Sequence, residues 1–220
     1  MIKIENVKVF NITGAVYSAR NAMNSWHLSD SDLENDILGE NDLKLAKKLS
    51  KAGTDHSKYL RMITVYMDIT APLYWWKQID QYKIGVTTSS TSTMHKIHEK
   101  EFTLDDFSHE HLINSVKVHL METIEILNEA RDGYINFEKF DTNNIVTGIS
   151  CKKDLWWQMI QLLPSSYNQK RTVMLNYQVL KNMYHARNNH KLTEWVCFCD
   201  EIKRLPYMED FINEMGGLQQ

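Results

Sequence analysis

His56–Lys83 reads HSKYLRMITVYMDITAPLYWWKQIDQYK, and this stretch decides the fold. Residues 63–69 alternate between apolar side chains and others, which predicts a strand with one buried face. The apolar members of this alternation are Ile63, Val65, Met67 and Ile69. Pro72 predicts the first residue of a helix, because its missing N–H has no partner there. The stretch therefore predicts a loop histidine, a strand, and a helix followed by a polar patch.

The N-terminal quarter of the chain carries two more periodic segments. Residues 2–10 alternate and predict an early strand, whereas residues 27–40 are acidic and polar and predict a loop or a weak helix. Asp42–Ala52 predicts a helix, with Gly53 as its C-terminal stop. The apolar stripe expected on this helix consists of Leu45, Leu49 and Ala52.

The rest of the chain favours helices. Ser108 predicts the cap of a long helix that reaches about Arg131, and Gly133 predicts its end. Further helices are expected over residues 153–162, about 167–187 and about 191–204. The apolar face of the long helix is expected to consist of Leu112, Val116, Leu120, Ile124 and Leu127. The chain is therefore expected to be α+β, helix-dominated with a small antiparallel sheet, and to form a single domain over residues 1–220.

Composition narrows the class of protein. The chain has 220 residues, 43% hydrophobic and 24% charged, which is ordinary for a soluble globular protein. A net charge of -3 without a long basic stretch argues against nucleic acid as a partner. No apolar run approaches the ~20 residues of a membrane span, and the polar N-terminus does not read as a signal peptide. Three cysteines without a CxxC pair are expected to be buried thiols, so the protein is expected in the cytoplasm.

Several short blocks occur in a fixed order along the chain. An Ala-Arg pair near the N-terminus precedes a glycine turn and a histidine, and an Ala-Pro-apolar-aromatic run follows the strand. A Leu-Pro pair near the C-terminus precedes an Asn and an Arg. The blocks are Ala19-Arg20, Gly53 with His56, Ala71-Pro72-Leu73-Tyr74 with Gln78, and Leu163-Pro164 with Asn176, Leu180 and Arg187. In their order and internal spacing they resemble one enzyme family, the flavin-dependent thymidylate synthases.

The signature motif of that family, RHRxxSxNExSxR, is eroded in this chain. It would begin at Gln81-Tyr82-Lys83, and its last Ser would match Ser92, with one extra residue between its two halves. Its final Arg is Met94, and the Arg expected two residues after Asn176 is Gln178. Replacing an arginine by Gln or Met removes both the charge and the fork that hold a phosphate. Lys83 keeps a charge, and Arg61 or Lys96 could add one.

The resemblance implies a function and a set of site residues. It implies a homotetramer with sites shared between subunits, in which FAD mediates one-carbon transfer from methylenetetrahydrofolate to dUMP or a related pyrimidine nucleotide, with NADPH as reductant. Arg187 would serve in catalysis. The residues that would face FAD are His56, Lys83, Asn176, Gln178 and His190, and those that would face the nucleotide are Gln78, Ser92 and Arg187. On a helix, Asn176, Leu180, Met183 and Arg187 would share one stripe suited to a flat ring with a phosphate beyond it.

The sequence also allows other interpretations. A non-catalytic homologue could keep the scaffold and oligomer as a nucleotide-binding or structural protein. His56 could be an exposed loop residue. The paired tryptophans at 75–76 and 156–157 could stack on a flavin or folate ring, but adjacent aromatics on a helix face different directions, which favours core or interface. The hydroxyl-rich residues 86–93 could form a solvent-facing loop or line a polar pocket. Histidines and glutamates over residues 95–111 could bind zinc or iron, but they lack a fixed ligand motif, so we expect no metal site.

Overall fold

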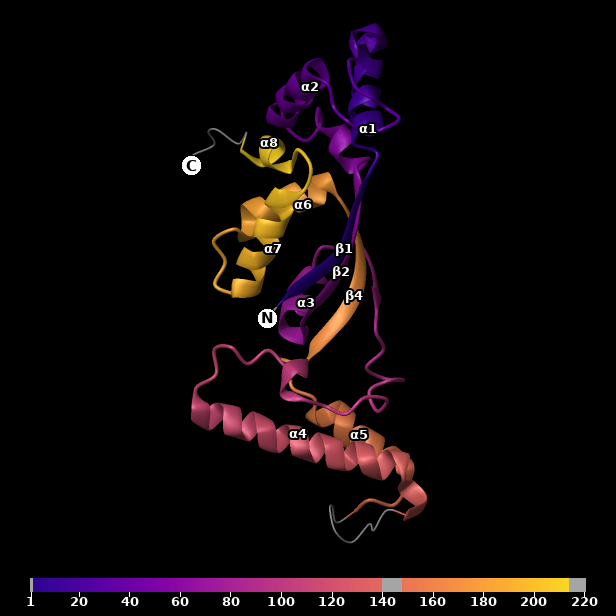
Figure 1. The fold of residues 1–220 in the computed structure, drawn as a ribbon, viewed down its shortest axis with the longest axis vertical. Helices are drawn as coiled ribbons and strands as arrows, with labels where there is room; N and C mark the ends of the chain where they lie inside the picture. Colours follow the sequence, from indigo (N-terminus) through magenta and orange to yellow (C-terminus); the bar gives the residue numbers. More distant parts are fainter. Residues whose placement is uncertain (1, 140–147, 214–220) are drawn as a thin grey trace. The chain divides into compact units, whose positions relative to one another are not determined.

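A computed structural model describes residues 2–139 and 148–213 of the chain (Figure 1). A four-stranded antiparallel sheet with strand order β1-β2-β4-β3 organises it. The strands are β1 (Lys3–Phe10), β2 (Thr64–Pro72), β3 (Thr87–Ser90) and β4 (Asn168–Asn176). The α-helices are α1 (Ile12–Ala19), α2 (Glu40–Lys51), α3 (Leu73–Ile79), α4 (Asn114–Ile135), α5 (Lys152–Leu162), α6 (Tyr177–Arg187), α7 (Thr193–Arg204) and α8 (Met208–Ile212). Short 3-10 turns cover Arg20–Met23, Trp26–Leu28, Lys58–Arg61, Leu104–Asp106 and Phe137–Lys139. The predicted α+β class with a small antiparallel sheet is confirmed.

The chain forms two compact units. The α6 unit comprises Ile2–Ile69, Asp80–Ser89 and the residues from Arg171 on, and the α4 unit comprises Thr70–Ile79 and Ser90–Lys170. Strands β2, β3 and β4 each pass from one unit into the other. The single-domain organisation stays a prediction.

Strand β2 forms as its sequence predicts. Val65, Met67 and Ile69 are buried, whereas Tyr66 between them is exposed. This alternation places one face of the strand in the core and leaves the other to solvent. Strand β1 agrees with the expectation for residues 2–10. Pro72 is the last residue of β2 and directly precedes α3, so the helix begins one residue later than predicted.

Helix α2 has the predicted location but a different buried stripe. Its buried residues are Asp42, Ala46 and Ser50. Leu45 and Leu49 of the predicted stripe are half-buried, and Ala52 is exposed and follows the helix, so the prediction was wrong for Ala52. Asp42 is drawn inward because its carboxylate pairs with the buried guanidinium of Arg20, at 2.6 Å from Nε. The hydroxyls of Ser29 and Ser31 donate to the same carboxylate, at 2.5 Å each. A fully paired buried charge therefore outweighs the apolar pattern.

Aromatic side chains fill the core of the α6 unit. Tyr59, Tyr177, Trp195, Phe198 and Phe211 are fully buried. The rings of Tyr59 and Tyr177 each pack edge-on against Phe211, at centroid distances of 6.0 and 6.2 Å. These contacts join the start of α6 to α8 and to the turn before β2.

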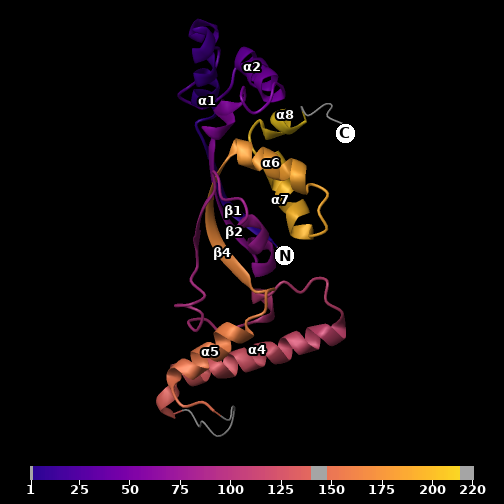
Figure 2. The same cartoon turned by 180° about the vertical axis from the view of Figure 1, so that it is seen from behind.

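In the α4 unit, α4 and α5 lie side by side in both views (Figures 1 and 2). Leu120, Ile124 and Leu127 of α4 are buried as predicted, together with Met159 of α5. The helix starts at Asn114, so the prediction of Ser108 as its cap was wrong. Ser108 instead donates its hydroxyl to Asn168 Oδ1 at 2.9 Å. Val116 is exposed, Leu112 precedes the helix, and Gly133 lies within α4 rather than at its end.

Two segments form strands where the sequence suggested other structures. Residues 168–176 form β4, although a helix was expected from about residue 167. Residues 87–90 form the exposed strand β3 at the edge of the sheet, where a loop was favoured. Thr91 next to β3 donates its N–H to the carbonyl of Lys170, so pairing with β4 extends the segment. Sheet pairing is a tertiary contact that the local pattern does not encode.

Trp75 and Trp76 are fully buried, which confirms the interpretation of this pair as core. Of the three cysteines only Cys199 is buried, and all three are free thiols, so the prediction of buried thiols was wrong for Cys151 and Cys197. Burial raises the pKa of the Cys199 thiol to about 12. Within residues 2–139 and 148–213, no helix combines the length and the apolar character that crossing a bilayer requires.

Candidate functional site

The last turn of α6 carries an arginine between two aromatic rings. Arg187 donates its Nε–H to the hydroxyl of Tyr82 at 3.1 Å. Its guanidinium carbon lies 5.1 Å from the centroid of the Trp195 ring and 5.9 Å from that of Tyr82. The centroids of the two rings are 6.2 Å apart. Cation–π contacts of this kind orient a guanidinium without neutralising it.

The charge of Arg187 is available to a ligand. Among the described residues, no carboxylate pairs with this guanidinium. Trp195 is fully buried on α7, so the ring beneath the guanidinium is fixed by the core. A half-buried arginine that is held in place yet not neutralised suits an anion, above all a phosphate.

His190 completes this group of residues, which we call the Arg187 cluster (Tyr82, Arg187, His190 and Trp195). Its ring lies 6.3 Å from that of Trp195, and its Nδ1 accepts the N–H of Leu192 at 3.1 Å. Burial, followed by the positive charges of Arg187 and Lys191, lowers the pKa of His190. The imidazole is therefore held neutral, with Nε2–H left to donate.

The first turn of α6 uses its polar residues differently. Asn176 caps the helix, because its Oδ1 accepts the N–H of Val179 at 3.0 Å. Gly85 packs against the same amide: a Cβ at Gly85, where φ is +73°, would lie 2.7 Å from Asn176 Nδ2. Asn176 therefore fixes both the start of α6 and the segment that leads from Lys83 to β3.

Gln178 is buried, and both ends of its amide are bound. Its Oε1 accepts the hydroxyl of Ser57 at 3.0 Å, and its Nε2 donates to Asn182 at 3.0 Å. This amide ties the loop that carries His56 to α6. Leu180 and Met183 of the predicted ligand-facing stripe are fully buried in the core, so the expectation that a flat ring lies over them was wrong.

His56 and Lys83 are both exposed. His56 borders a hollow of about 420 Å³ that is also lined by Asp55, Lys58 and Asn21. Neither side chain forms a hydrogen bond or an ion pair with another described residue. Both side chains are thus open to an anion in solution.

Gln78 and Ser92 belong to the α4 unit, whereas the other predicted site residues belong to the α6 unit. Gln78 is half-buried at the end of α3. Ser92 is half-buried and its Oγ accepts the N–H of His95 at 3.0 Å. Arg61 and Lys96 are the two residues that could replace a lost arginine charge of the motif. Lys96 pairs with Glu99, whereas Arg61 is exposed.

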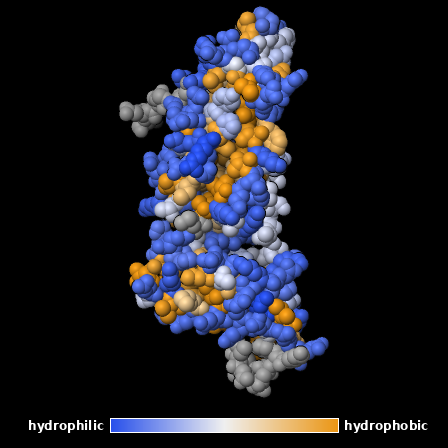
Figure 3. All heavy atoms as spheres, viewed as in Figure 1, coloured by the Kyte–Doolittle hydropathy of each residue, from blue (hydrophilic) through white to orange (hydrophobic). Residues whose placement is uncertain are grey.

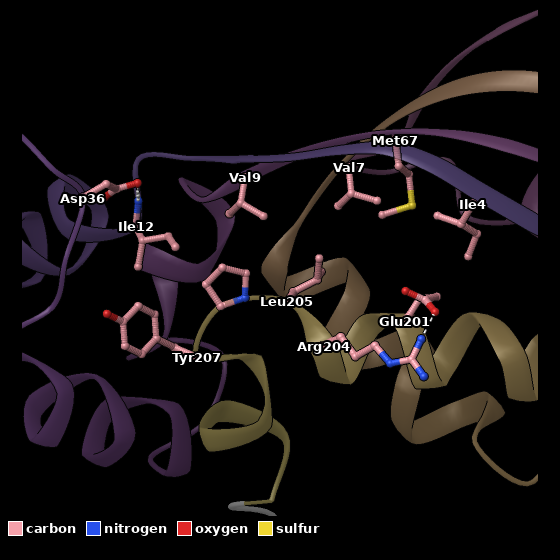
Figure 4. Close-up of a pocket in the computed structure, with 11 residues that line it drawn as sticks. Ile4, Val7, Val9, Ile12, Asp36, Met67, Glu201, Arg204, Leu205 and Tyr207 are labelled. Atoms are coloured by element: carbon pink, nitrogen blue, oxygen red, sulfur yellow. Dashed lines mark hydrogen bonds and ion pairs between the residues drawn. The ribbon is translucent and has the colours of Figure 1, made fainter.

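A further hollow of about 690 Å³ lies between β1 and α7 in the α6 unit (Figure 4). Its walls are mostly apolar, with Ile4, Val7 and Leu205 among them. In the space-filling view, apolar side chains gather in this part of the unit (Figure 3). Its charged groups are engaged, since Arg204 pairs with Glu201, and Asp36 accepts the N–H of Thr13 at 2.7 Å. None of the predicted site residues lines it.

Tyr82 and Trp195 are the functional candidates that sequence reasoning missed. They contact Arg187 from other segments of the chain, and neither carries a charge. One feature of the sequence could have identified Tyr82: it lies within the eroded signature motif. In the part of the chain that the structure describes, no three His, Cys, Asp or Glu side chains are placed to hold a metal ion.

No family model and no curated protein matches the sequence. Solved structures do match. The crystal structure of thymidylate synthase X from Helicobacter pylori with FAD and dUMP is similar at a TM-score of 0.65 and 15% identity, over 96% of this chain and 95% of that one. A flavin-dependent thymidylate synthase from Helicobacter pylori complexed with FAD and dUMP is similar at a TM-score of 0.63 and 17% identity, over 96% of both chains. The chain therefore has the thymidylate synthase X fold, as the resemblance implied.

Proposed function

We propose that the chain is a flavin-dependent thymidylate synthase that transfers a one-carbon unit from methylenetetrahydrofolate to dUMP or a related pyrimidine nucleotide, with NADPH as reductant. The observation that carries this proposal is Arg187, held by Tyr82 and Trp195 with no carboxylate partner among the described residues. The similarity to structures solved with FAD and dUMP supports the same function.

Arg187 binds the nucleotide phosphate in this proposal. Its guanidinium can offer two parallel N–H groups to a phosphate. The Tyr82 hydroxyl accepts the Nε–H and thereby leaves the remaining N–H groups to the ligand. Gln78 and Ser92 contribute hydrogen bonds to the nucleotide, in a homotetramer whose subunits share each site, and the reaction takes place in the cytoplasm.

The residues that the resemblance assigns to FAD have two kinds of role in this proposal: some contact FAD, and others position the elements around it. Lys83 and His56 are exposed, so they can hold the diphosphate of FAD directly. Gln178 has both ends of its amide bound within the protein, so it positions α6 and the His56 loop. Asn176 caps α6 through its Oδ1, which leaves its Nδ2–H groups to donate to FAD. His190 offers its Nε2–H. When bound, FAD supplies the redox chemistry of the transfer, which no side chain can supply.

A second function is favoured by one observation. Gln178 stands where the family resemblance places an arginine, and its amide is fully engaged with Ser57 and Asn182. A site that has lost this charge can keep the nucleotide and lose the flavin. The second candidate is therefore a nucleotide-binding homologue without flavin chemistry.

A pair of binding measurements separates the two candidates. The purified full chain is dialysed to equilibrium against FAD and, separately, against dUMP, and the bound flavin is measured by its visible absorbance. The enzyme hypothesis predicts bound FAD, and dTMP formation that requires dUMP, methylenetetrahydrofolate and NADPH together. Binding of dUMP without binding of FAD would favour the second candidate. Absence of both would contradict both.

A further inference from the structure

The α4 unit contains a hollow that the proposed function does not use. It has a volume of about 710 Å³, within the range of roughly 300–1,000 Å³ that small-molecule sites occupy. The hollow lies where the start of α5 meets the end of α4. We call it the α5 pocket, and its lining consists of Met94, His95, Tyr134, Lys152, Lys153 and Trp156.

Its aromatic walls are held in place. The indole N–H of Trp156 donates to the carbonyl of Met94 at 2.9 Å. The ring of Trp156 also packs edge-on against Trp157, at 4.7 Å between centroids. On the opposite element, the ring of Tyr134 lies 4.7 Å from that of His98. Two fixed aromatic rings, with a flexible methionine lining the same hollow, suit a flat ring system.

Two lysines give the α5 pocket a positive charge. Lys152 Nζ lies 4.4 Å from the centroid of the Tyr134 ring, and Lys153 is its neighbour at the start of α5. Among the described residues, neither lysine has a carboxylate partner. The helix adds the partial positive charge of its N-terminus on the same side.

The carboxylates near the pocket are engaged elsewhere. Asp154 accepts the N–H and the hydroxyl of Ser150 and the N–H of Cys151, at 2.8 to 2.9 Å. These bonds lower the pKa of Asp154 to about 2, so one negative charge stands beside the two lysines at neutral pH. Glu99 pairs with Lys96. The lining itself therefore keeps an excess of positive charge.

We propose that the α5 pocket binds a small organic phosphate that carries a flat ring. The ring lies against Trp156 and Tyr134, and the phosphate is held by Lys152 and Lys153. The pocket shares no residue with the Arg187 cluster and lies in the other unit, so this proposal does not depend on the proposed function.

The test uses three probes on the full-length protein: phenyl phosphate, inorganic phosphate and benzyl alcohol. Isothermal titration calorimetry is expected to show phenyl phosphate binding at least tenfold more tightly than either of the other two. Each of those carries only one of the two features that the pocket recognises. Equal affinity of phenyl phosphate and inorganic phosphate would overturn the proposal, and so would the absence of phenyl phosphate binding.

Matched variants test whether phenyl phosphate binds in the α5 pocket. The double substitution Lys152→Met and Lys153→Met is expected to weaken phenyl phosphate binding about tenfold or more. The control is Lys44→Met with Lys48→Met, since these lysines lie on an exposed face of α2 whose neighbouring hollow has no aromatic lining. The control is expected to change the affinity less than twofold. Equal losses in the two double variants would show attraction by overall charge and would overturn the proposal.

The ring contact has its own variant. Trp156→Leu is expected to weaken phenyl phosphate about fivefold and to leave inorganic phosphate unchanged. Arg187→Met removes the phosphate-binding group of the Arg187 cluster, so phenyl phosphate binding that remains in this variant and is lost in the lysine variant belongs to the α5 pocket. Loss of phenyl phosphate binding in Arg187→Met, with no loss in the lysine variant, would assign the binding to the Arg187 cluster instead. Thermal unfolding of each variant shows whether it is folded.

Discussion

The two ends of α6 use polar residues in opposite ways. At the first turn, Asn176 and Gln178 bind their amides to Val179, Ser57 and Asn182. At the last turn, Arg187 is held by aromatic rings and keeps its charge for a ligand. One helix thus carries residues that hold the scaffold and a residue that is available to recognise an anion.

This difference shows that a match to a motif position does not define what a residue does. Both ends of α6 were assigned to ligand binding on the same resemblance. Their hydrogen bonds differ. Both ends of the buried Gln178 amide are bound, so Gln178 would have to break a bond before it contacts a ligand, and Asn176 uses its Oδ1 for the cap. We therefore expect substitution of Arg187 to change mainly ligand affinity, and substitution of Gln178 or Asn176 to change mainly the free energy of unfolding. The opposite result would contradict this difference between the two ends of α6.

The largest effect is expected at Arg187. Arg187→Met removes the charged partner of the phosphate, and hydrogen bonds to charged groups contribute roughly 1.5–3 kcal/mol. We expect dUMP to bind about 10- to 100-fold more weakly. The free energy of unfolding should fall by only about 0.5–1 kcal/mol, the size of the lost cation–π contacts. Isothermal titration calorimetry and urea unfolding measure the two quantities.

Two controls sharpen the Arg187 result. Arg187→Lys keeps the charge but not the planar fork, so its affinity should lie between those of the wild type and Arg187→Met. Arg204→Met removes an exposed arginine that pairs with Glu201 on α7, and it should leave the affinity unchanged. Unaltered dUMP binding in Arg187→Met would remove the assigned nucleotide site.

Sequence patterns predicted the fold where one face of an element is apolar. The alternation over residues 63–69 identified β2, since its buried side chains recur at every second position. Strand β4 was missed because its buried positions include Gln169 beside Val173 and Leu175. Gln169 is tolerated there because its Nε2 donates to the carbonyl of Thr91 at 2.7 Å, a partner that the local pattern cannot show.

The candidate site could be predicted only in part, for the same reason. The resemblance pointed to Arg187, which is a local feature of one helix. Its neighbours Tyr82 and Trp195 come from other segments of the chain, and only the fold brings them together. The structural role of Gln178 depends on Ser57, which is 121 positions away. The sequence alone therefore did not show which distant residues contact one another in the folded chain.

Gln178 should affect stability and not nucleotide affinity. Gln178→Leu keeps the approximate volume but leaves the buried hydroxyl of Ser57 without its acceptor, which costs about 1–3 kcal/mol of unfolding free energy. Urea unfolding measures this loss. Gln161→Leu, at an exposed position of α5, is the matched control and should be nearly neutral. A stable Gln178→Leu variant that no longer binds FAD would place Gln178 at the ligand.

A smaller loss of stability is expected at Asn176. Asn176→Ala removes the cap of α6 and should cost about 1 kcal/mol, whereas Asn176→Ser keeps an oxygen that can accept the N–H of Val179. Thermal unfolding of the two variants measures the difference. Equal stabilities of the Ala and Ser variants would contradict the capping role.

The smallest effect is expected from His190 and depends on pH. The folded protein lowers the pKa of His190, so the unfolded chain binds more protons below the ordinary value of 6.5. Stability from this group is therefore present above about pH 6.5 and is lost as the pH falls toward the lower folded pKa. The physical causes are burial of the imidazole, which disfavours its charged form, and then the positive charges of Arg187 and Lys191.

Unfolding by urea at several pH values between about 5 and 8 tests this effect, since the ordinary histidine pKa lies inside that interval. His190→Gln should flatten the fall in stability below pH 6.5. In Arg187→Met the pKa of His190 should lie closer to its ordinary value, because one of the positive charges that lower it is gone. The difference in slope that His190→Gln produces should therefore be smaller in the Arg187→Met background than in the wild type. A difference of unchanged size would mean that the charge of Arg187 does not contribute to the lowered pKa of His190, and that burial and Lys191 set it.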